Sequence, residues 1–171
     1  MLFHKPSLSK KLALIMTQAF ALRDYTDTDE TAVIGVHDLA RPLELMGSCD
    51  AAAFVPLADD ADDLAEFLSV HKTVACVDDT IVGFVGVEDD QLGWLYVHPE
   101  FARRGIGRRL LRHALQQIKG VARVHVLDGN APALQLYHTE GFTLTDTFDS
   151  KSHGYVCRVM ALTRKGDLVD C

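Results

Sequence analysis

The chain has 171 residues, of which 48% are hydrophobic and 24% are charged, and its formal net charge is -7. This length suits one domain with a sizeable core, and the composition is that of an ordinary globular protein. Because an acidic chain is poorly suited to general nucleic-acid binding, we expect no nucleic-acid partner. We expect a single domain over residues 19–171, after an N-terminal extension over residues 1–18 that is disordered or helical.

The cysteines and histidines are scattered along the chain. No C-x-x-C motif occurs, and the eight histidines show no ligand spacing, so we expect no metal site. No apolar run approaches the ~20 residues of a membrane span, so we expect no membrane partner. Free thiols in a reducing, cytoplasmic compartment are the simplest interpretation of the four cysteines, which are Cys49, Cys76, Cys157 and Cys171.

The N-terminal part of the domain is predicted to contain two helices and a β-meander. Asp27 or Thr28 is the expected N-cap of the first helix, and acidic residues also begin the second, where the positive end of the helix dipole favours them. Two Asp-Asp pairs mark turns between strands. The predicted elements are a strand at 20–26, helices at 26–45 and 58–70, and strands at 73–77, 80–88 and 91–97.

The C-terminal part is predicted to alternate helices with strands. After Gly105, apolar residues recur at helical spacing, and Gly120 is well placed to end that helix. The order of strands and helices predicts an α/β (α+β) fold with a mixed sheet. The remaining elements are a strand at 122–128, a helix at 131–140 and two closing strands at 142–148 and 154–164.

The stretch YVHPEFARRGIGRRLL, residues 96–111, concentrates glycine and positive charge on this acidic chain. A helix that begins near Gly105 presents free backbone N–H groups and its positive dipole end. Gly105 and Gly107 let a ligand approach that backbone, which together with nearby charge makes a site suited to a phosphate or pyrophosphate. The alternative is a tight turn with solvated arginines. The charge comes from Arg103, Arg104 and Arg108.

The segments LYVHPEFARRGIGRRLL and NAPALQLYHTEGF together resemble the coenzyme A site of the GCN5-related N-acetyltransferases. The first is similar to their pyrophosphate loop, Q/R-x-x-G-x-G/A, and the second to the asparagine, short helix, tyrosine and Gly-Phe that follow it. The resemblance covers residues 80–162 well and residues 20–79 only by element order. It departs from the family at Ala102, where Gln or Arg is usual, and at Arg103, where glycine is usual.

The resemblance implies a mixed, mostly antiparallel central sheet with splayed strands, flanked by about four helices. Acetyl-CoA, as co-substrate, would lie between the strand that ends at Val97 and the strand around residues 124–127. Asn130 fits an ordinary helix cap as well as it fits a pantetheine contact. The residues assigned to the cofactor by resemblance are Leu95, Tyr96, Val97, Arg103, Arg104, Gly105, Ile106, Gly107, Arg108, Asn130 and Tyr137.

The implied reaction is acetyl transfer to a primary amine by direct attack in a ternary complex. Tyr137 is the expected catalytic residue beside the departing thiolate, although a tyrosine on a short helix also suits a core position. Glu88 is the candidate base, directly or through water, and its alternative is a solvated carboxylate at a strand end. Asp90 is a weaker candidate. A backbone N–H within residues 95–97 is expected to stabilise the oxyanion.

The resemblance leaves the acceptor open, as a small-molecule or peptide amine. The acidic run at residues 59–63 would attract a cationic amine, or it simply favours the start of a helix. His153 and Tyr155 are candidate contacts with an alternative structural role. A CoA-binding sensor or interaction domain of the same fold, without catalysis, is the alternative function. A homodimer is left open.

Overall fold

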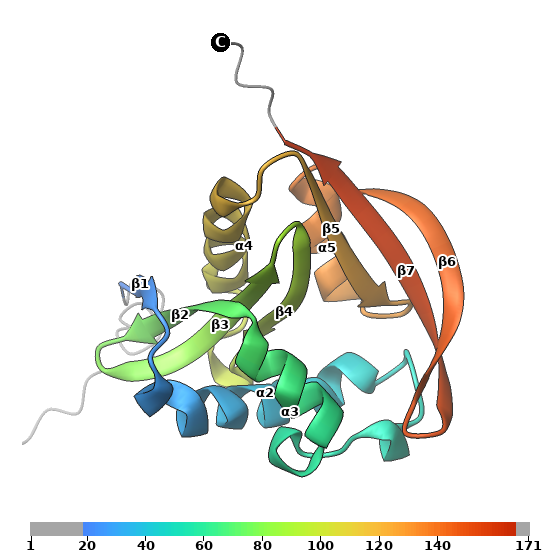
Figure 1. Cartoon of the computed structure of the whole chain (residues 1–171), viewed down its shortest axis with the longest axis horizontal. Helices are drawn as coiled ribbons and strands as arrows, with labels where there is room; N and C mark the ends of the chain where they lie inside the picture. The colour runs from blue at the N-terminus through green and yellow to red at the C-terminus, as the bar shows by residue number, and fades with distance from the viewer. Residues whose placement is uncertain (1–18, 167–171) are drawn as a thin grey trace, which may run out of the picture.

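The computed structural model describes residues 19–166. The expected extension at 1–18 and Cys171 lie outside this part of the chain. A seven-stranded sheet runs in the order β1-β2-β3-β4-β5-β7-β6, with helices packed on both of its faces (Figure 1). Neighbouring strands are antiparallel except for β4 and β5. The expected mixed, mostly antiparallel sheet flanked by helices is therefore confirmed.

The elements follow the predicted order closely. The closing hairpin is longer than expected, because its first strand continues four residues beyond the predicted end at 148. The strands are β1 (Ala21–Asp24), β2 (His71–Val77), β3 (Thr80–Glu88), β4 (Gln91–Val97), β5 (Val121–Leu127), β6 (Thr143–Ser152) and β7 (Tyr155–Lys165). The helices are η1 (Asp27–Asp29), α2 (Glu30–Leu45), η2 (Ala51–Ala53), η3 (Leu57–Asp59), α3 (Ala61–Ser69), η4 (Pro99–Phe101), α4 (Ile106–Gln117) and α5 (Ala131–Thr139).

Two apolar layers hold the helices against the sheet. On one face, Leu110 and Leu111 of α4 are fully buried against a core that includes Val124 of β5 and Tyr137 of α5. On the other face, α2 and α3 pack over a second cluster that includes Phe67, Phe84 and Trp94. Burial of these side chains, at roughly 1.5–3 kcal/mol each, is the main force that fixes the helices on the sheet.

The first helical segment, η1, is capped by Thr26, one residue before the first expected cap. The Asp29 carboxylate accepts hydrogen bonds of 2.8 Å from the Thr26 backbone N–H and 3.0 Å from its hydroxyl. Arg23 donates two more, of 2.6 and 2.8 Å, to the same carboxylate. Chiefly because of the Arg23 hydrogen bonds, the pKa of Asp29 lies well below its usual range. Asp27 and Thr28 therefore do not cap this helix.

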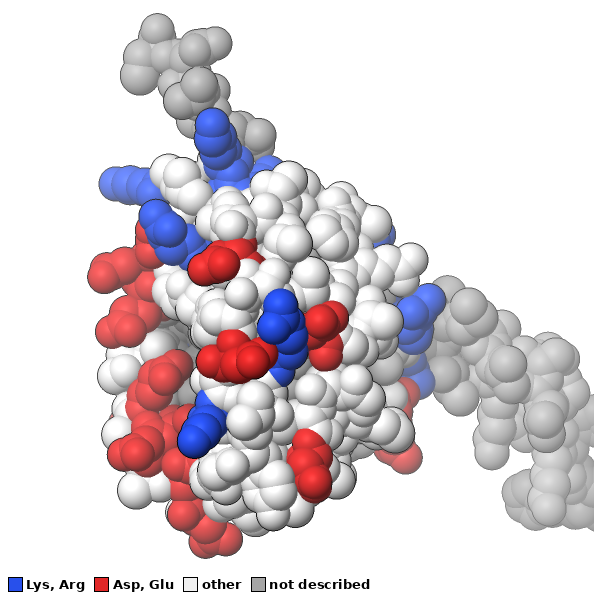
Figure 2. Space-filling model, turned by 90° about the vertical axis from the view of Figure 1, so that its right-hand side faces the viewer, with Lys and Arg blue, Asp and Glu red and all other residues white. Residues whose placement is uncertain are grey.

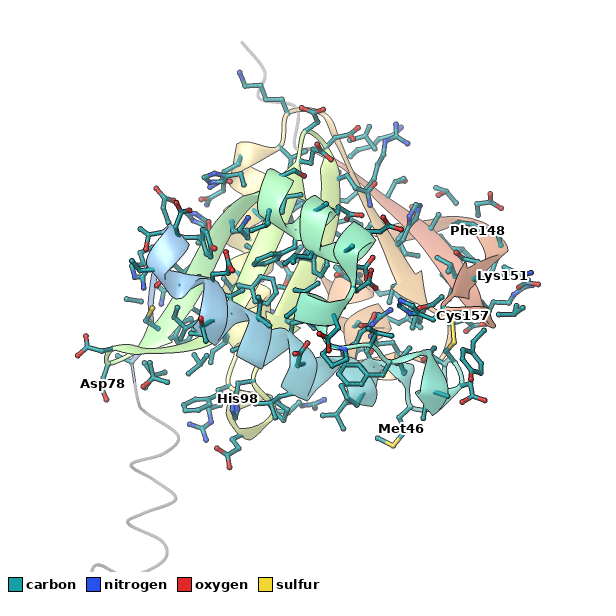
Figure 3. The ribbon with its side chains drawn as sticks, turned by 60° about the horizontal axis from the view of Figure 1, so that its bottom comes forward. Met46, Asp78, His98, Phe148, Lys151 and Cys157 are labelled. Carbon is teal, nitrogen blue, oxygen red and sulfur yellow. A yellow bond between two sulfur atoms is a disulfide. The ribbon has the colours of Figure 1, made fainter. Side chains whose placement is uncertain are left out.

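A disulfide joins Cys49, in the loop after α2, to Cys157 in β7 (Figure 3). The two cysteines are 108 residues apart in the sequence, so no short sequence spacing predicted that they would pair. This corrects the expectation of free thiols for these two residues. Cys76 is a free, buried cysteine of β2.

Candidate active site

The parallel strands β4 and β5 separate after a very short contact. They pair only at Gln91 with Arg123 and at Leu92 with Val124. In Figure 1 the two strands start close together in the upper part of the view and diverge toward its lower part. The edge of β4 beyond Leu92 is therefore not paired with β5, which leaves backbone groups facing the gap.

A cleft of about 770 Å³ occupies the space between the diverging strands. Its walls come from β4, from the loop before α4, from the start of α5 and from the last turns of α2. This cleft brings together ten of the eleven residues predicted to bind the cofactor: Leu95, Tyr96, Val97, Arg103, Gly105, Ile106, Gly107, Arg108, Asn130 and Tyr137.

The loop before α4 has the backbone that an anion site needs. Gly105 is the N-cap of α4 and has a φ of 81°, in the left-handed region that glycine adopts without strain. It offers no capping side chain, so the first-turn N–H groups of the helix have no side-chain partner from the cap. A Cβ added at Gly107 would meet Val97 and Leu136 at 3.6 and 3.7 Å, which is ordinary contact. The position would therefore accept a Cβ without a clash.

The arginines of this loop differ in their roles. Arg103 lines the cleft and has a φ of 65°, unusual for a residue with a side chain. Arg108 also lines the cleft, and its Nε lies 3.0 Å from Glu140 Oε1. Arg104 is not among the lining residues of the cleft; its guanidinium lies 4.8 Å from the Phe101 ring centroid and donates to the Glu100 carbonyl. The structure thus brings two of the three predicted arginines to the cleft.

The second predicted segment forms the opposite wall of the cleft. Asn130 caps α5, because its side-chain oxygen accepts from the Ala133 N–H at 3.3 Å, and it also lines the cleft. Tyr137 is 5% exposed and packs edge-on against Phe142 while it lines the same space. Burial raises the pKa of the Tyr137 phenol, with a smaller contribution from Glu44. The hydroxyl therefore carries its proton near neutral pH.

Glu88 does not join this constellation. It is exposed at the end of β3 and pairs with Gln91, the first residue of β4, away from the part of β4 that borders the cleft. It is not among the residues that line the cleft. Its charge instead faces α3, where it contributes to raising the pKa of Glu66 after the larger effects of burial and Asp63. Asp90 lies in the same turn and pairs with Arg123 at 3.0 Å. Their positions give no support to either residue as the base.

The carboxylate that does line the cleft is Glu44, from the last turn of α2. Arg41 holds its Oε2 at 2.6 Å, and the Tyr96 hydroxyl donates to the same oxygen at 2.7 Å. Burial, and then Glu44, raise the pKa of Tyr96 well above its usual value. Sequence reasoning missed Glu44 because 52 residues separate it from its strand partner.

Two further findings concern ions and membranes. Within the described residues, no group of three or more His, Cys, Asp or Glu side chains is arranged to hold a metal ion. Over the same part of the chain, the helices are too short or too polar to cross a membrane.

Known proteins with similar sequences are acetyltransferases. A model of the acetyltransferase (GNAT) domain matches residues 65–144. The peptidyl-lysine N-acetyltransferase YiaC of Escherichia coli K12 is 33% identical over 70 residues, which are 40% of this chain and 47% of the relative. The match therefore spans about half the length of this curated relative.

Similar folds occur in solved structures of the same kind. A GCN5-related N-acetyltransferase from Rhodopseudomonas palustris has a TM-score of 0.76 and 19% identity, and the alignment covers 85% of this chain and 94% of that one. The PaiA N-acetyltransferase of Thermoplasma acidophilum, solved in complex with coenzyme A, has a TM-score of 0.69, 20% identity and coverage of 86% and 99%. At such identities these likenesses concern the fold.

Proposed function

Because this chain belongs to the GCN5-related N-acetyltransferase superfamily, we propose that it is an acetyl-CoA-dependent N-acetyltransferase. The observation that carries the proposal is the unpaired edge of β4, which begins at Gly93 and opens into the same cleft as the glycine loop and Tyr137. A pantetheine arm supplies amide groups that pair with such an edge, as an additional strand would.

Each end of the cofactor has a matching part of the cleft. The N–H groups at the start of α4, with Arg103 and Arg108, would hold the pyrophosphate. The unpaired backbone of residues 95–97 would hold the pantetheine and offer an N–H to the oxyanion. Tyr137, with its phenol protonated, would donate a proton or a hydrogen bond to the thiolate of the departing coenzyme A.

The acceptor in this proposal is a primary amine that attacks the thioester directly in a ternary complex. Asp63 and Glu66 lie on α3, where burial and neighbouring carboxylates raise the pKa of both. Figure 2 shows acidic side chains gathered along one edge of the face that it presents. Such a field would attract a cationic amine toward this side of the molecule.

The proposal is tested by two measurements on the full chain. Calorimetry with acetyl-CoA and with CoA measures binding, and release of free CoA thiol is followed with a panel of amines. The panel contains free amino acids, polyamines, an aminoglycoside, a peptide with a free N-terminus and an N-blocked lysine peptide. Binding together with thiol release supports the proposal. Binding without release across the panel would favour a non-catalytic CoA-binding domain, and absence of binding would exclude both functions.

A further inference from the structure

A second cavity, of about 230 Å³, opens on the α2 side of the sheet. Arg41 comes to it from α2, Phe148 and Ser150 from β6, and His125 from β5. Within the described residues, His125 is the one residue that lines both this cavity and the cofactor cleft. The His125 side chain therefore stands where the two spaces meet.

The position of His125 follows from the splay of the strands. The last residue of β5 that pairs with β4 is Val124, opposite Leu92, so His125 is the first residue of β5 after these two strands separate. Val124 and Val126 are buried in the core beneath α4, and the alternation of a strand turns His125 to the other face. The corresponding next residue of β4 is Gly93, and Glu66 Oε1 lies 3.4 Å from the position that a Cβ would take there.

The imidazole of His125 is free to exchange a proton. Its ring is exposed and stands edge-on to Phe148, with centroids 5.4 Å apart. Within residues 19–166 it takes part in no hydrogen bond or ion pair. Glu44 differs, because Arg41 and the Tyr96 hydroxyl both occupy its Oε2. His125 therefore has a nitrogen lone pair that is not held by another side chain of the described residues, as a base requires.

We propose that His125 is the general base of the transfer, and that the acceptor amine reaches the thioester through the second cavity. This inference rests on the proposed function and adds to it the proton acceptor and the entry side. A volume of 230 Å³ corresponds to about eight waters at roughly 30 Å³ each. The cavity therefore has room for the terminal atoms of an acceptor amine.

The proposed step balances in atoms and charge. An unprotonated ring nitrogen of His125 takes one proton from the acceptor ammonium, and the freed nitrogen lone pair forms a C–N bond to the acetyl carbonyl carbon. The C–S bond then breaks and its electron pair leaves on sulfur. The thiolate takes a proton from the Tyr137 hydroxyl. The nitrogen of the former amine then gives its second N–H proton to Tyr137, which restores the phenol. The His125 imidazolium releases its proton to solvent, so each turnover releases one proton.

The ionisable neighbours of His125 are mostly paired with one another. Arg41 is paired with Glu44, and Arg123 with Asp90. Within residues 19–166, His125 is therefore an imidazole of this region without an ion-pair partner, whereas His37 and His153 each lie beside a carboxylate. The other charged and titratable groups that line the two spaces are Arg41, Glu44, Tyr96, Arg103, Arg108 and Tyr137. Arg123, paired with Asp90, lies two residues away on β5, and Glu66 lies near Gly93 of β4.

The test compares His125→Gln and His125→Ala with the wild-type protein, using the amine from the panel that gives the highest thiol release. We expect kcat/KM to fall about 10²- to 10⁴-fold in both variants, which is the usual contribution of a general base. The acidic limb of the pH profile should disappear, and added imidazole should restore part of the activity of His125→Ala alone. The matched control is His113→Ala on α4, whose side chain bonds Gln117 away from both spaces.

The outcomes separate this inference from the proposed function. If the wild-type protein turns over and the His125 variants keep its kcat/KM and its acidic limb, the inference is overturned while the enzyme assignment stands. Loss of the limb in Glu88→Gln, with the limb intact in His125→Gln, would also overturn it. Calorimetry with CoA checks that the variants are folded, because both His125 variants should bind CoA with the affinity of the wild-type protein.

Discussion

The Tyr96 hydroxyl donates a 2.7 Å hydrogen bond to Glu44, and so ties β4, the strand that borders the cleft, to the last turn of α2. Arg41 holds the same carboxylate oxygen at 2.6 Å. These contacts set the distance between two walls that belong to segments far apart in the sequence. The end of α2 is therefore part of the site, although the cofactor motifs lie entirely in the second half of the chain.

Tyr96→Phe removes this link and keeps the backbone of β4. We expect the KM for the acceptor to rise about tenfold, since one hydrogen bond is worth on the order of 1.4 kcal/mol. The KM for acetyl-CoA should change less, because the backbone contacts remain. The measurement is steady-state kinetics with each substrate varied in turn. Tyr25→Phe is the matched control, since the buried Tyr25 hydroxyl has no partner within the described residues; equal effects in both variants would contradict the role of the Glu44 contact.

Tyr137→Phe tests the role of the buried phenol. We expect kcat to fall about 10²-fold, as is usual when a group that transfers a proton is lost, with little change in the affinity for CoA. Burial raises the Tyr137 pKa. The pH–activity profile of the wild-type protein should therefore show no loss of activity from ionisation of this phenol at mildly alkaline pH. Kinetics and calorimetry check both points. Full turnover in a folded Tyr137→Phe protein would remove Tyr137 from the mechanism.

Arg103→Gly should separate stability from cofactor binding. A residue with a side chain at a φ of 65° is strained, so glycine should raise the free energy of unfolding by about 1 kcal/mol. The same change removes a positive charge from the cleft and should weaken CoA binding. Arg103→Ala is the control, because it loses the charge and keeps the strain. Urea unfolding and calorimetry distinguish the two variants, and equal stabilities would argue against strain at this position.

Asp29→Asn should lower stability and flatten its dependence on acid. Because the folded-state pKa of Asp29 is lowered, the stability it contributes is complete above the unfolded pKa, near 3.9, and is lost as the pH falls below that value. We expect a loss of roughly 1–2 kcal/mol at pH 7, measured by urea unfolding, and a smaller loss at pH 3. Asp24→Asn, at an exposed carboxylate, should change neither. A variant as acid-sensitive as the wild-type protein would contradict this account.

Cys49→Ser should lower the free energy of unfolding by about 2–5 kcal/mol, because the bond closes a long loop of the unfolded chain. The loop spans 108 residues. Thermal unfolding with and without a reductant is the measurement, and the reduced wild-type protein should match the variant. Cys76→Ser, at the free cysteine of β2, should respond to the reductant as the wild-type protein does. No effect of the reductant on the wild-type protein would show that the bond does not form.

The sequence was sufficient to predict the fold and to choose residues that line one cleft, because these depend on local patterns. Apolar periodicity predicted α4, and Gly105 and Gly107 marked its start. Those signals act within a few residues, and the structure bears them out in the order of the elements and in the lining of the cleft. The resemblance to a known family supplied the splay of the strands.

The proposed acceptor side was not predictable in this way, because it depends on contacts between distant segments. Glu44 reaches the cleft only after α2 has packed on the sheet, and Cys49 meets Cys157 only when β7 is in place. Glu88 ends a central strand, as the sequence predicts, but it does so at the turn where β4 and β5 are still paired. His125 had a weak signal, as a polar residue alternating with buried valines in a strand.

The disulfide also has a mechanical consequence. If the two ends of the chain were pulled apart, force would pass directly from Cys49 to Cys157, and the 108 residues of sequence separation would bear no load. Fully extended, that length corresponds to roughly 360–390 Å of chain. A single oxidised molecule would therefore stretch to a much shorter contour than a reduced one. The β4, α4 and α5 walls of the cleft lie inside the shielded loop and would remain unstretched, whereas the α2 wall lies outside it and would bear load.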